Sequence, residues 1–265
     1  MLPYPQIDPV LIHLGPLQVR WYGLMYVVGF IASYLLVRHQ IRRYKLTQLA
    51  GHFENLNLVL IISLVLGARV GYVLFYNPGY YLENPQDILA TWQGGMSFHG
   101  ALAGMLVGGL IFCHRTGLPF WQTADIYIIT TPIGLGLGRI GNFINGELYG
   151  RESDVPWAMV FPSGGPIPRH PSQLYEAFLE GIVLFSLLWF LKGRYWQRRW
   201  PTGSLLALFL IFYGIFRTIV ELFRQPDEQL GFLFNFLTMG QLLSSLMIGT
   251  GLLILLLRRN STTPA

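Results

Sequence analysis

The segment 138–151, GRIGNFINGELYGR, holds the densest group of residues in the chain that could do chemistry. Its glycines allow close helix packing and then a tight, non-helical backbone. Arg139 is its most informative member, because a guanidinium can bind phosphate through two parallel hydrogen bonds and stays charged in a membrane. A packed helix with a polar loop would explain any one of these residues alone. The concentration of all of them in one short segment instead predicts a functional site.

A second pair of charges, Arg217 and Glu221, lies four residues apart, which places both side chains on one face of a helix. The pair could simply neutralise two charges inside a membrane. It could also contribute to an anion site, because Glu221 can orient Arg217 while the guanidinium keeps donors free. The sequence leaves both interpretations open.

His99 lies at the start of an apolar segment, within GGMSFHG at 94–100. A neutral imidazole with a pKa near 6.5 suits a general base, and a purely structural histidine is the alternative. Ser97 lies two residues earlier, but no G-x-S-x-G context supports a serine hydrolase. His99 is therefore a candidate base.

No metal or cofactor is expected. Residues 136–141 match the G-x-G-x-x-G dinucleotide pattern, which has meaning only between the strand and helix of a βαβ unit. No pair of His, Asp or Glu residues has metal-ligand spacing. The single cysteine, Cys113, lies in an apolar run and is expected to pack rather than react.

The composition indicates the elements that must position these residues. Of 265 residues, 52% are hydrophobic and only 12% are charged, against about 25% charged in a soluble domain. A water-soluble enzyme, a disordered chain and a disulfide scaffold are excluded. The net charge of +5 suggests anionic lipid head groups rather than nucleic acid. We therefore expect an all-α integral membrane protein.

Apolar runs of about 20 residues predict transmembrane helices. We expect seven of them, in a single membrane domain that comprises residues 1–265. The expected spans are 21–37, 55–76, 96–113, 119–141, 171–191, 203–223 and 238–257, with a small outer loop region at 142–170.

The basic residues predict the orientation of the chain. The loops on one side hold 11 of the 18 Lys and Arg residues, and such loops are cytoplasmic. The N-terminus is then outside and the C-terminus is cytoplasmic. This orientation places a layer of polar side chains near the outer face: Tyr22, Arg69, His99, Arg139, Asn142, Arg217 and Glu221. Charges inside spans are costly, so a shared cavity is expected there.

Several segments together resemble the bacterial prolipoprotein diacylglyceryl transferases. They are WYGLMY at 21–26, Phe98-His99-Gly100, the segment 138–151, 169–176 and FRQP at 223–226. The similarity runs from about Asp8 to Leu257, and the long asparagine-containing motif is highly specific.

The resemblance implies a transferase that moves the sn-1,2-diacylglyceryl group of phosphatidylglycerol to the lipobox cysteine thiol of a prolipoprotein. Glycerol phosphate is released in this first step of bacterial lipoprotein maturation. The implied location is the bacterial inner membrane, with the active site toward the outer face. The implied catalytic residues are Tyr22, His99, Arg139 and Arg217, and phosphatidylglycerol would be bound by Arg139, Asn142, Glu147, Gly150, Arg217 and Glu221.

The residue chemistry is compatible with this reaction. A thiol with a pKa near 8.5 is only a few per cent ionised at pH 7, so a base or a positive field must help. Arg139 and Arg217 would stabilise the departing phosphate. The base could be His99 or Tyr22, or the mechanism could be purely electrostatic. Without the resemblance, a lipid or anion transporter and a non-catalytic lipid-binding scaffold are the alternatives. A transporter should have inner-side polar groups that match the outer ones, and this sequence does not have them, whereas the dense Asn, Arg and Gly segment would be excessive for a scaffold.

Overall fold

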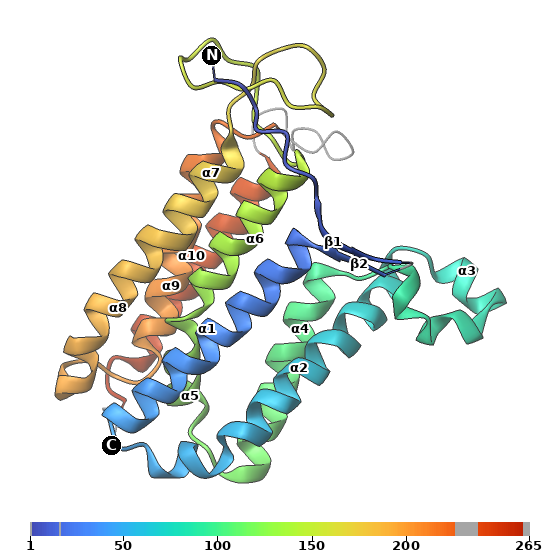
Figure 1. Cartoon of the computed structure of the whole chain (residues 1–265). Coiled ribbons are helices and arrows are strands. Elements are labelled where there is room, and N and C mark those ends of the chain that lie inside the picture. The colour runs from blue at the N-terminus through green and yellow to red at the C-terminus, as the bar shows by residue number, and fades with distance from the viewer. Residues whose placement is uncertain (1, 16, 226–237, 262–265) are drawn as a thin grey trace. The chain divides into compact units, whose positions relative to one another are not determined.

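The computed structural model describes residues 2–15, 17–225 and 238–261, and the chain is mainly helical (Figure 1). It divides into two compact units, one formed by residues 1–37 and 124–265 and the other by residues 38–123. Helices α1 (Trp21–Arg43) and α5 (Phe120–Ile128) continue from one unit into the other. The single membrane domain predicted from the sequence stays a prediction.

The unit of residues 38–123 is built on two antiparallel helices, α2 (Thr47–Phe75) and α4 (Phe98–Thr116). Between them run the short helix α3 (Pro78–Glu83) and two 3₁₀ turns, η1 (Pro85–Leu89) and η2 (Thr91–Gln93). A Cβ atom on Gly67 would lie 2.4 Å from the Gly100 oxygen, and one on Gly104 would lie 2.2 Å from the Ser63 oxygen. The two helices therefore touch backbone to backbone, as small residues permit in membranes.

The other unit begins with a hairpin of strands β1 (Val10–Leu14) and β2 (Leu17–Arg20), which the all-helical prediction missed. Gly15, with φ of 61°, makes its turn. After α1 come α5, α6 (Thr131–Asn145), α9 (Ser204–Glu221) and α10 (Met239–Arg258). Between α6 and α9 a helical run comprises α7 (Ser172–Glu176), η3 (Ala177–Val183), α8 (Leu184–Arg194) and η4 (Tyr195–Arg199), and η3 and η4 are π-helical.

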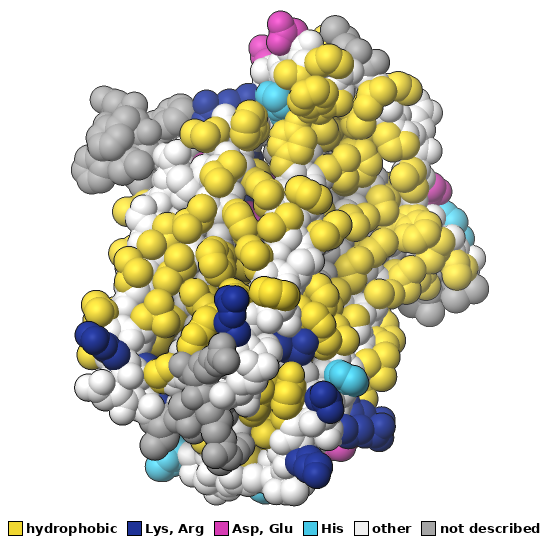
Figure 2. Space-filling view, turned by 90° about the vertical axis from the view of Figure 1, so that its left-hand side faces the viewer, with side chains coloured by type: hydrophobic (Ala, Val, Ile, Leu, Met, Phe, Trp, Pro, Cys, Tyr) yellow, Lys and Arg dark blue, Asp and Glu magenta, His cyan; other side chains and the backbone are white. Residues whose placement is uncertain are grey.

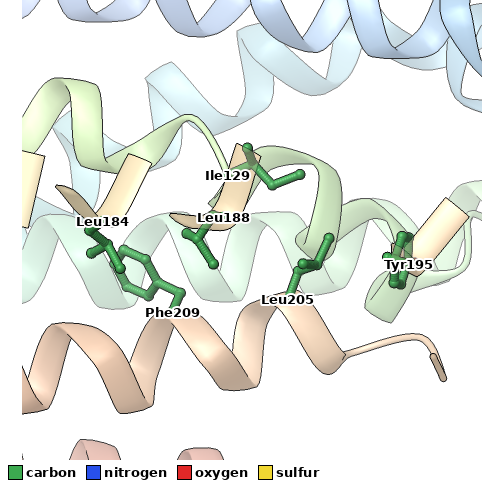
Figure 3. Close-up of a cluster of buried hydrophobic side chains, with 6 residues drawn as sticks. All are labelled: Ile129, Leu184, Leu188, Tyr195, Leu205 and Phe209. Carbon is green, nitrogen blue, oxygen red and sulfur yellow. The ribbon is translucent and has the colours of Figure 1, made fainter. Parts of the chain in front are cut away.

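The core of this unit joins α8 and η4 to α9 and to the turn after α5. Its fully or nearly buried side chains are Ile129, Leu184, Leu188, Tyr195, Leu205 and Phe209 (Figure 3). Asp125 fixes the start of α9, because its carboxylate accepts hydrogen bonds from the Gly203 and Leu206 amides at 2.6 and 2.8 Å. These amides have no partner within the helix, so Asp125 has a structural role.

A compact loop region follows α6, close to the range 142–170 expected from the sequence. Phe143, Met159 and Phe161 form a small core there, and the Tyr4 hydroxyl donates to the Phe143 oxygen at 2.7 Å. Backbone bridges join Glu152 and Met159 to Arg169. This loop region is therefore ordered by its own contacts.

Helices long and apolar enough to cross a membrane account for most of the described structure. Five meet both criteria in the described ranges: Trp21–Arg43, Thr47–Phe75, Ser172–Gln197, Ser204–Glu221 and Met239–Arg258. Large apolar side chains point outward, with Phe190 and Leu257 both 72% exposed, and hydrophobic side chains cover much of the face drawn in Figure 2. Because such exposure is unfavourable in water, the chain is a multi-pass membrane protein.

The expected third and fourth spans differ from these five. Helix α4 covers the third, whereas the fourth, 119–141, is divided into α5 and α6 by a turn at Ile129 and Thr130. The Thr130 hydroxyl closes this turn by donating to the Tyr127 oxygen at 2.8 Å. Pro132 lies in the first turn of α6, where a backbone N–H would have no partner within the helix, so proline is tolerated there. The count of seven spans stays a prediction.

Candidate active site

The segment 138–151 ends helix α6 and folds back on it. Gly146, with φ of 67°, terminates the helix in the left-handed conformation. The Glu147 side chain then returns toward α6, where its Oε1 accepts hydrogen bonds from Asn142 Nδ2 at 2.8 Å and Asn145 Nδ2 at 3.1 Å. Asn142 is buried and Glu147 is exposed. Glu147 therefore fixes the orientation of the Asn142 amide.

The loop after Glu147 is anchored on neighbouring segments. Gln173 Nε2 donates to the Glu147 oxygen at 2.6 Å, and the Gly150 amide donates to the His170 oxygen at 2.8 Å. A Cβ atom at Gly150 would lie 2.4 Å from the Phe223 oxygen. Only glycine fits at this position, so the structure shows a packing role for Gly150, and its role in substrate binding stays a prediction.

The two arginines expected to act together meet at one carboxylate. Glu176 Oε2 lies 2.7 Å from Arg139 Nε and 2.7 Å from Arg217 Nη1, and the Glu176 side chain is fully buried. Arg139 comes from α6, Arg217 from α9 and Glu176 from α7. Three helices of one unit thus bring their charged groups to one point.

Arg217 has two further carboxylates beside it. Its Nη2 lies 3.1 Å from Glu221 Oε2, as the four-residue spacing predicts, and its Nη1 lies 3.9 Å from Glu180 Oε1. The Glu221 carboxyl also packs against Gly240, at the start of α10, where the helix dipole favours a negative charge. Arg217 is therefore held from several sides, and its side chain is only 12% exposed.

Arg139 is more open. Its side chain is 21% exposed, and only Nε is engaged in an ion pair. Within the described part of the chain, its two terminal nitrogens make no hydrogen bond. They form the planar fork that suits two oxygens of one phosphate. Arg139 can therefore bind an anion without breaking its bond to Glu176.

Tyr22 lies next to this group. Its ring packs against Gly141 of α6, where an added Cβ would lie 2.8 Å from ring atom Cδ2. The Tyr22 and Tyr26 hydroxyls are 3.1 Å apart. The structure thus places Tyr22 against α6 at Gly141, which is two residues beyond Arg139 in the chain.

His99 and Arg69 belong to the other unit. His99 is exposed in the first turn of α4, and its role as a base stays a prediction. Ser97 caps this helix by accepting a hydrogen bond from the Gly100 amide at 3.1 Å. Arg69 is buried and donates to four carbonyl oxygens, those of Asp87, Ile88, Gly94 and Gly95. Ser97 and Arg69 therefore have structural roles.

His170 lies at the rim of the loop region. Its Nδ1 is 3.0 Å from the Tyr175 hydroxyl, and its backbone pairs with Gly150 and Arg151. Burial lowers the pKa of His170 below its usual value of 6.5. His170 is thus a neutral, structural group at neutral pH.

Sequence reasoning missed the two carboxylates of α7 and η3. Glu176 belongs to the segment 169–176 that carries the family resemblance, but neither it nor Glu180 is among the predicted site residues. Both lie inside an apolar span, where a charged residue is costly and is a functional candidate. That signal was available in the sequence, but the partners of these carboxylates were not.

Comparison with known proteins identifies the family. The model of the prolipoprotein diacylglyceryl transferase family matches residues 9–257. This chain belongs to that family. A relative from Desulfotalea psychrophila is 60% identical over 250 residues, which cover 94% of this chain and 92% of the relative. A relative from Bordetella avium is 50% identical over the whole of both chains.

Both relatives are named phosphatidylglycerol–prolipoprotein diacylglyceryl transferase. A third of the same name, from Geobacter sulfurreducens, is 50% identical over 97% of this chain and 98% of its own length. As a member of the family, the chain is an enzyme, a diacylglyceryl transferase. The resemblance found in the sequence is thereby confirmed.

Proposed function

We propose that this chain transfers the diacylglyceryl group of phosphatidylglycerol to the lipobox cysteine thiol of a prolipoprotein. A bond forms between the cysteine sulfur and the glycerol carbon, and the bond from that carbon to the phosphate oxygen breaks. The oxygen keeps the electron pair and leaves as glycerol phosphate, and the thiol proton passes to a base or to solvent. The observation that carries the proposal is the meeting of Arg139 and Arg217 at Glu176.

The two arginines have different parts in this mechanism. The open fork of Arg139 binds the phosphodiester of the lipid and stabilises the charge that develops on the leaving oxygen. Arg217 holds Glu176 in place and adds a second positive charge. Asn142, oriented by Glu147, adds hydrogen bonds to the lipid head group, and Gly150 and Glu221 complete the binding region.

The proton acceptor is His99, Tyr22 or no single residue. The contact of Tyr22 with α6, close to Arg139, supports Tyr22 as the proton acceptor. The exposure of His99 at the start of α4 supports His99 in this role. In the purely electrostatic alternative, the field of the arginines favours the thiolate. The reaction uses no metal or cofactor, and no nucleic acid partner is involved.

The same proposal includes seven transmembrane helices in the bacterial inner membrane. The N-terminus is outside, the C-terminus is cytoplasmic, and the site opens toward the outer face and the lipid bilayer. The basic last turns of α1, α4, α8 and α10 support this orientation.

The test is direct transfer in a purified system. The protein is incubated with phosphatidylglycerol vesicles and a synthetic lipobox peptide, and the peptide is weighed by mass spectrometry. We expect a mass increase of one diacylglyceryl group, with release of glycerol phosphate. A peptide in which serine replaces cysteine is the control. An unmodified cysteine peptide, with the protein shown to be folded, would contradict the proposal.

A further inference from the structure

Leu148 has a backbone conformation that leucine rarely adopts. Among the residues that the structure describes, two that are not glycine have a positive φ: Lys45 at 53° and Leu148 at 57°. In this left-handed region the side chain of an L-residue crowds its own backbone, so glycine is favoured there and asparagine is tolerated better than leucine. Such strain persists only where the surrounding structure imposes it, and it is concentrated at functional sites.

Hydrogen bonds from the first turn of α7 impose this conformation. Ser172 Oγ donates to the Leu148 oxygen at 3.1 Å, and Gln173 Nε2 donates to the Glu147 oxygen at 2.6 Å. Both donor residues are fully buried. The acceptors are backbone oxygens, which any residue would offer at these two positions. The hydrogen bonds therefore explain the backbone conformation but do not explain why position 148 is a leucine.

Packing within the loop region does not explain the leucine either. The side chain of Leu148 is 40% exposed, and the core of the loop region is built from Phe143, Met159 and Phe161. Glycine or asparagine at position 148 would offer the same backbone oxygen with less strain. An exposed apolar side chain on a firmly held backbone is instead suited to contact a substrate.

Leu148 directly follows a residue of the proposed binding region. The carboxylate of Glu147 accepts a hydrogen bond from Asn142 at 2.8 Å, near the C-terminal end of α6. Arg139, the proposed phosphate ligand, lies one turn earlier in the same helix. Leu148 therefore lies just beyond the end of the helix that carries the site.

The two substrates differ in where their apolar parts lie. With the phosphate at Arg139 and the proposed orientation, the acyl chains run from the glycerol into the bilayer, away from the loop region that follows α6. The other substrate is a signal peptide, in which an apolar stretch of about 7–15 residues precedes the cleavage site. Its apolar side chains reach the site together with the cysteine. Leu148 thus fits the peptide better than the lipid.

We propose that Leu148 is a specificity-determining residue, whose side chain contacts the apolar residues on the N-terminal side of the prolipoprotein cysteine. Leu148 then contributes to the affinity for the peptide and not to the affinity for phosphatidylglycerol. This inference rests on the proposed function, because it requires the lipid at Arg139 and the peptide beside it.

The test compares Leu148→Asn with the wild-type protein in the peptide assay. Asparagine tolerates the left-handed conformation but lacks the apolar surface. We expect the KM for the cysteine peptide to rise about tenfold, as the loss of one apolar contact predicts, with the KM for phosphatidylglycerol unchanged. The affinity for the unreactive serine peptide, measured by fluorescence anisotropy with the protein in nanodiscs, should fall by the same factor. The melting temperature should not fall, because the substitution relieves strain.

Two further variants separate the apolar contact from the strain. Leu148→Met keeps an apolar side chain and should retain the wild-type KM for the peptide. Lys45→Asn is the matched control, because it relieves the same strain in the turn between α1 and α2, and it should leave both KM values unchanged. If Leu148→Asn folds poorly, Leu148→Gly replaces it, because glycine also accepts this φ.

The inference is overturned if folded Leu148→Asn or Leu148→Gly binds the serine peptide as tightly as the wild type does. A defect confined to the KM for phosphatidylglycerol would overturn it as well, because the contact would then be with the lipid. If the wild-type protein leaves the cysteine peptide unmodified, the proposed function fails instead, so the two failures are distinguishable.

Discussion

At the scale of single residues, Arg139 and Arg217 occupy different environments although they share Glu176. Arg139 is 21% exposed and its terminal nitrogens bond to none of the residues that the structure describes, whereas Arg217 pairs with carboxylates on more than one side. A guanidinium already bound by carboxylates has fewer donors for a substrate. We therefore propose that Arg139 is the principal phosphate ligand and that Arg217 positions Glu176.

The first prediction concerns Arg139→Lys. Lysine keeps the charge but loses the planar fork, so kcat/KM for phosphatidylglycerol should fall at least about tenfold, or about 1.4 kcal/mol. Mass spectrometry of the peptide measures the rate. Arg194→Lys, which changes an exposed arginine at the end of α8, should retain full activity. Undiminished turnover of folded Arg139→Lys would refute the phosphate clamp.

A second prediction tests His99 as the base. If His99 takes the thiol proton, His99→Gln should react about 10²–10⁴-fold more slowly near pH 7. The defect should shrink as the pH approaches about 8.5, where the thiol ionises without help. Turnover from pH 6.5 to 9 on matched folded protein measures this, with His52→Gln in the same unit as the control. A defect that does not change with pH would move the proton acceptor to Tyr22 or to the electrostatic alternative.

A third prediction follows from the lowered pKa of His170. Below pH 6.5 the unfolded chain binds a proton at this residue more readily than the folded protein does. The contribution of His170 to stability is thus present above pH 6.5 and is lost as the pH falls through the lowered folded pKa. The melting temperature of the wild type should fall with acidification over this range. His170→Gln should show a smaller fall, and identical pH profiles would contradict the assignment.

At the scale of elements, glycines determine how closely the helices approach. In one unit α2 meets α4 through Gly67, Gly100 and Gly104, and in the other α6 meets η3 through Gly136 and Gly181. Helices in a lipid environment gain little from the hydrophobic effect, so close van der Waals contact carries much of their association. The contact of α6 with η3 also holds Arg139 and Glu176 in register.

The fourth prediction is that Gly104→Ala destabilises the contact between α2 and α4. The new Cβ would lie 2.2 Å from the Ser63 oxygen, and such overpacking typically costs about 1–3 kcal/mol. The melting temperature in detergent should fall by several degrees. Gly51→Ala, in the same unit, adds a Cβ with no atom within 4 Å, and it should be neutral or stabilising. A Gly104→Ala protein as stable as the wild type would show that α2 and α4 are free to separate.

At the scale of the whole molecule, the membrane and its two sides organise the chain. The five long apolar helices of the described ranges require a bilayer. Among them α1, α10 and the run that contains α8 have basic residues in a last turn, which predicts that these ends are cytoplasmic. The cluster of Arg139, Arg217 and Glu176 lies near the C-terminal end of α6, which the loop region follows in the chain. If that region is outside, the site faces the lipoprotein precursors as they emerge.

The fifth prediction concerns this orientation. Cys113 is the single cysteine, so Cys113→Ser gives a background for new cysteines. A cysteine at position 151 should react with a membrane-impermeant maleimide in intact cells, and one at position 194 should react only after lysis. The reverse pattern would place the site on the cytoplasmic face and would exclude the proposed reaction with exported precursors.

The amino-acid sequence alone was sufficient to predict the membrane class, most of the helices, the family and the residues that could take part in chemistry. Composition and apolar run length depend only on residue type, and the spacing of Arg217 and Glu221 is local to one helix. The break between α5 and α6, the hairpin and the π-helical stretches were not predicted, because they depend on local hydrogen bonds and on neighbouring segments. The three-dimensional arrangement was needed to show that Arg139 and Arg217 share Glu176 and that Glu180 lies 3.9 Å from Arg217, with no hydrogen bond from any described residue. These partners come from three helices far apart in the chain, and packing alone decides which charges meet.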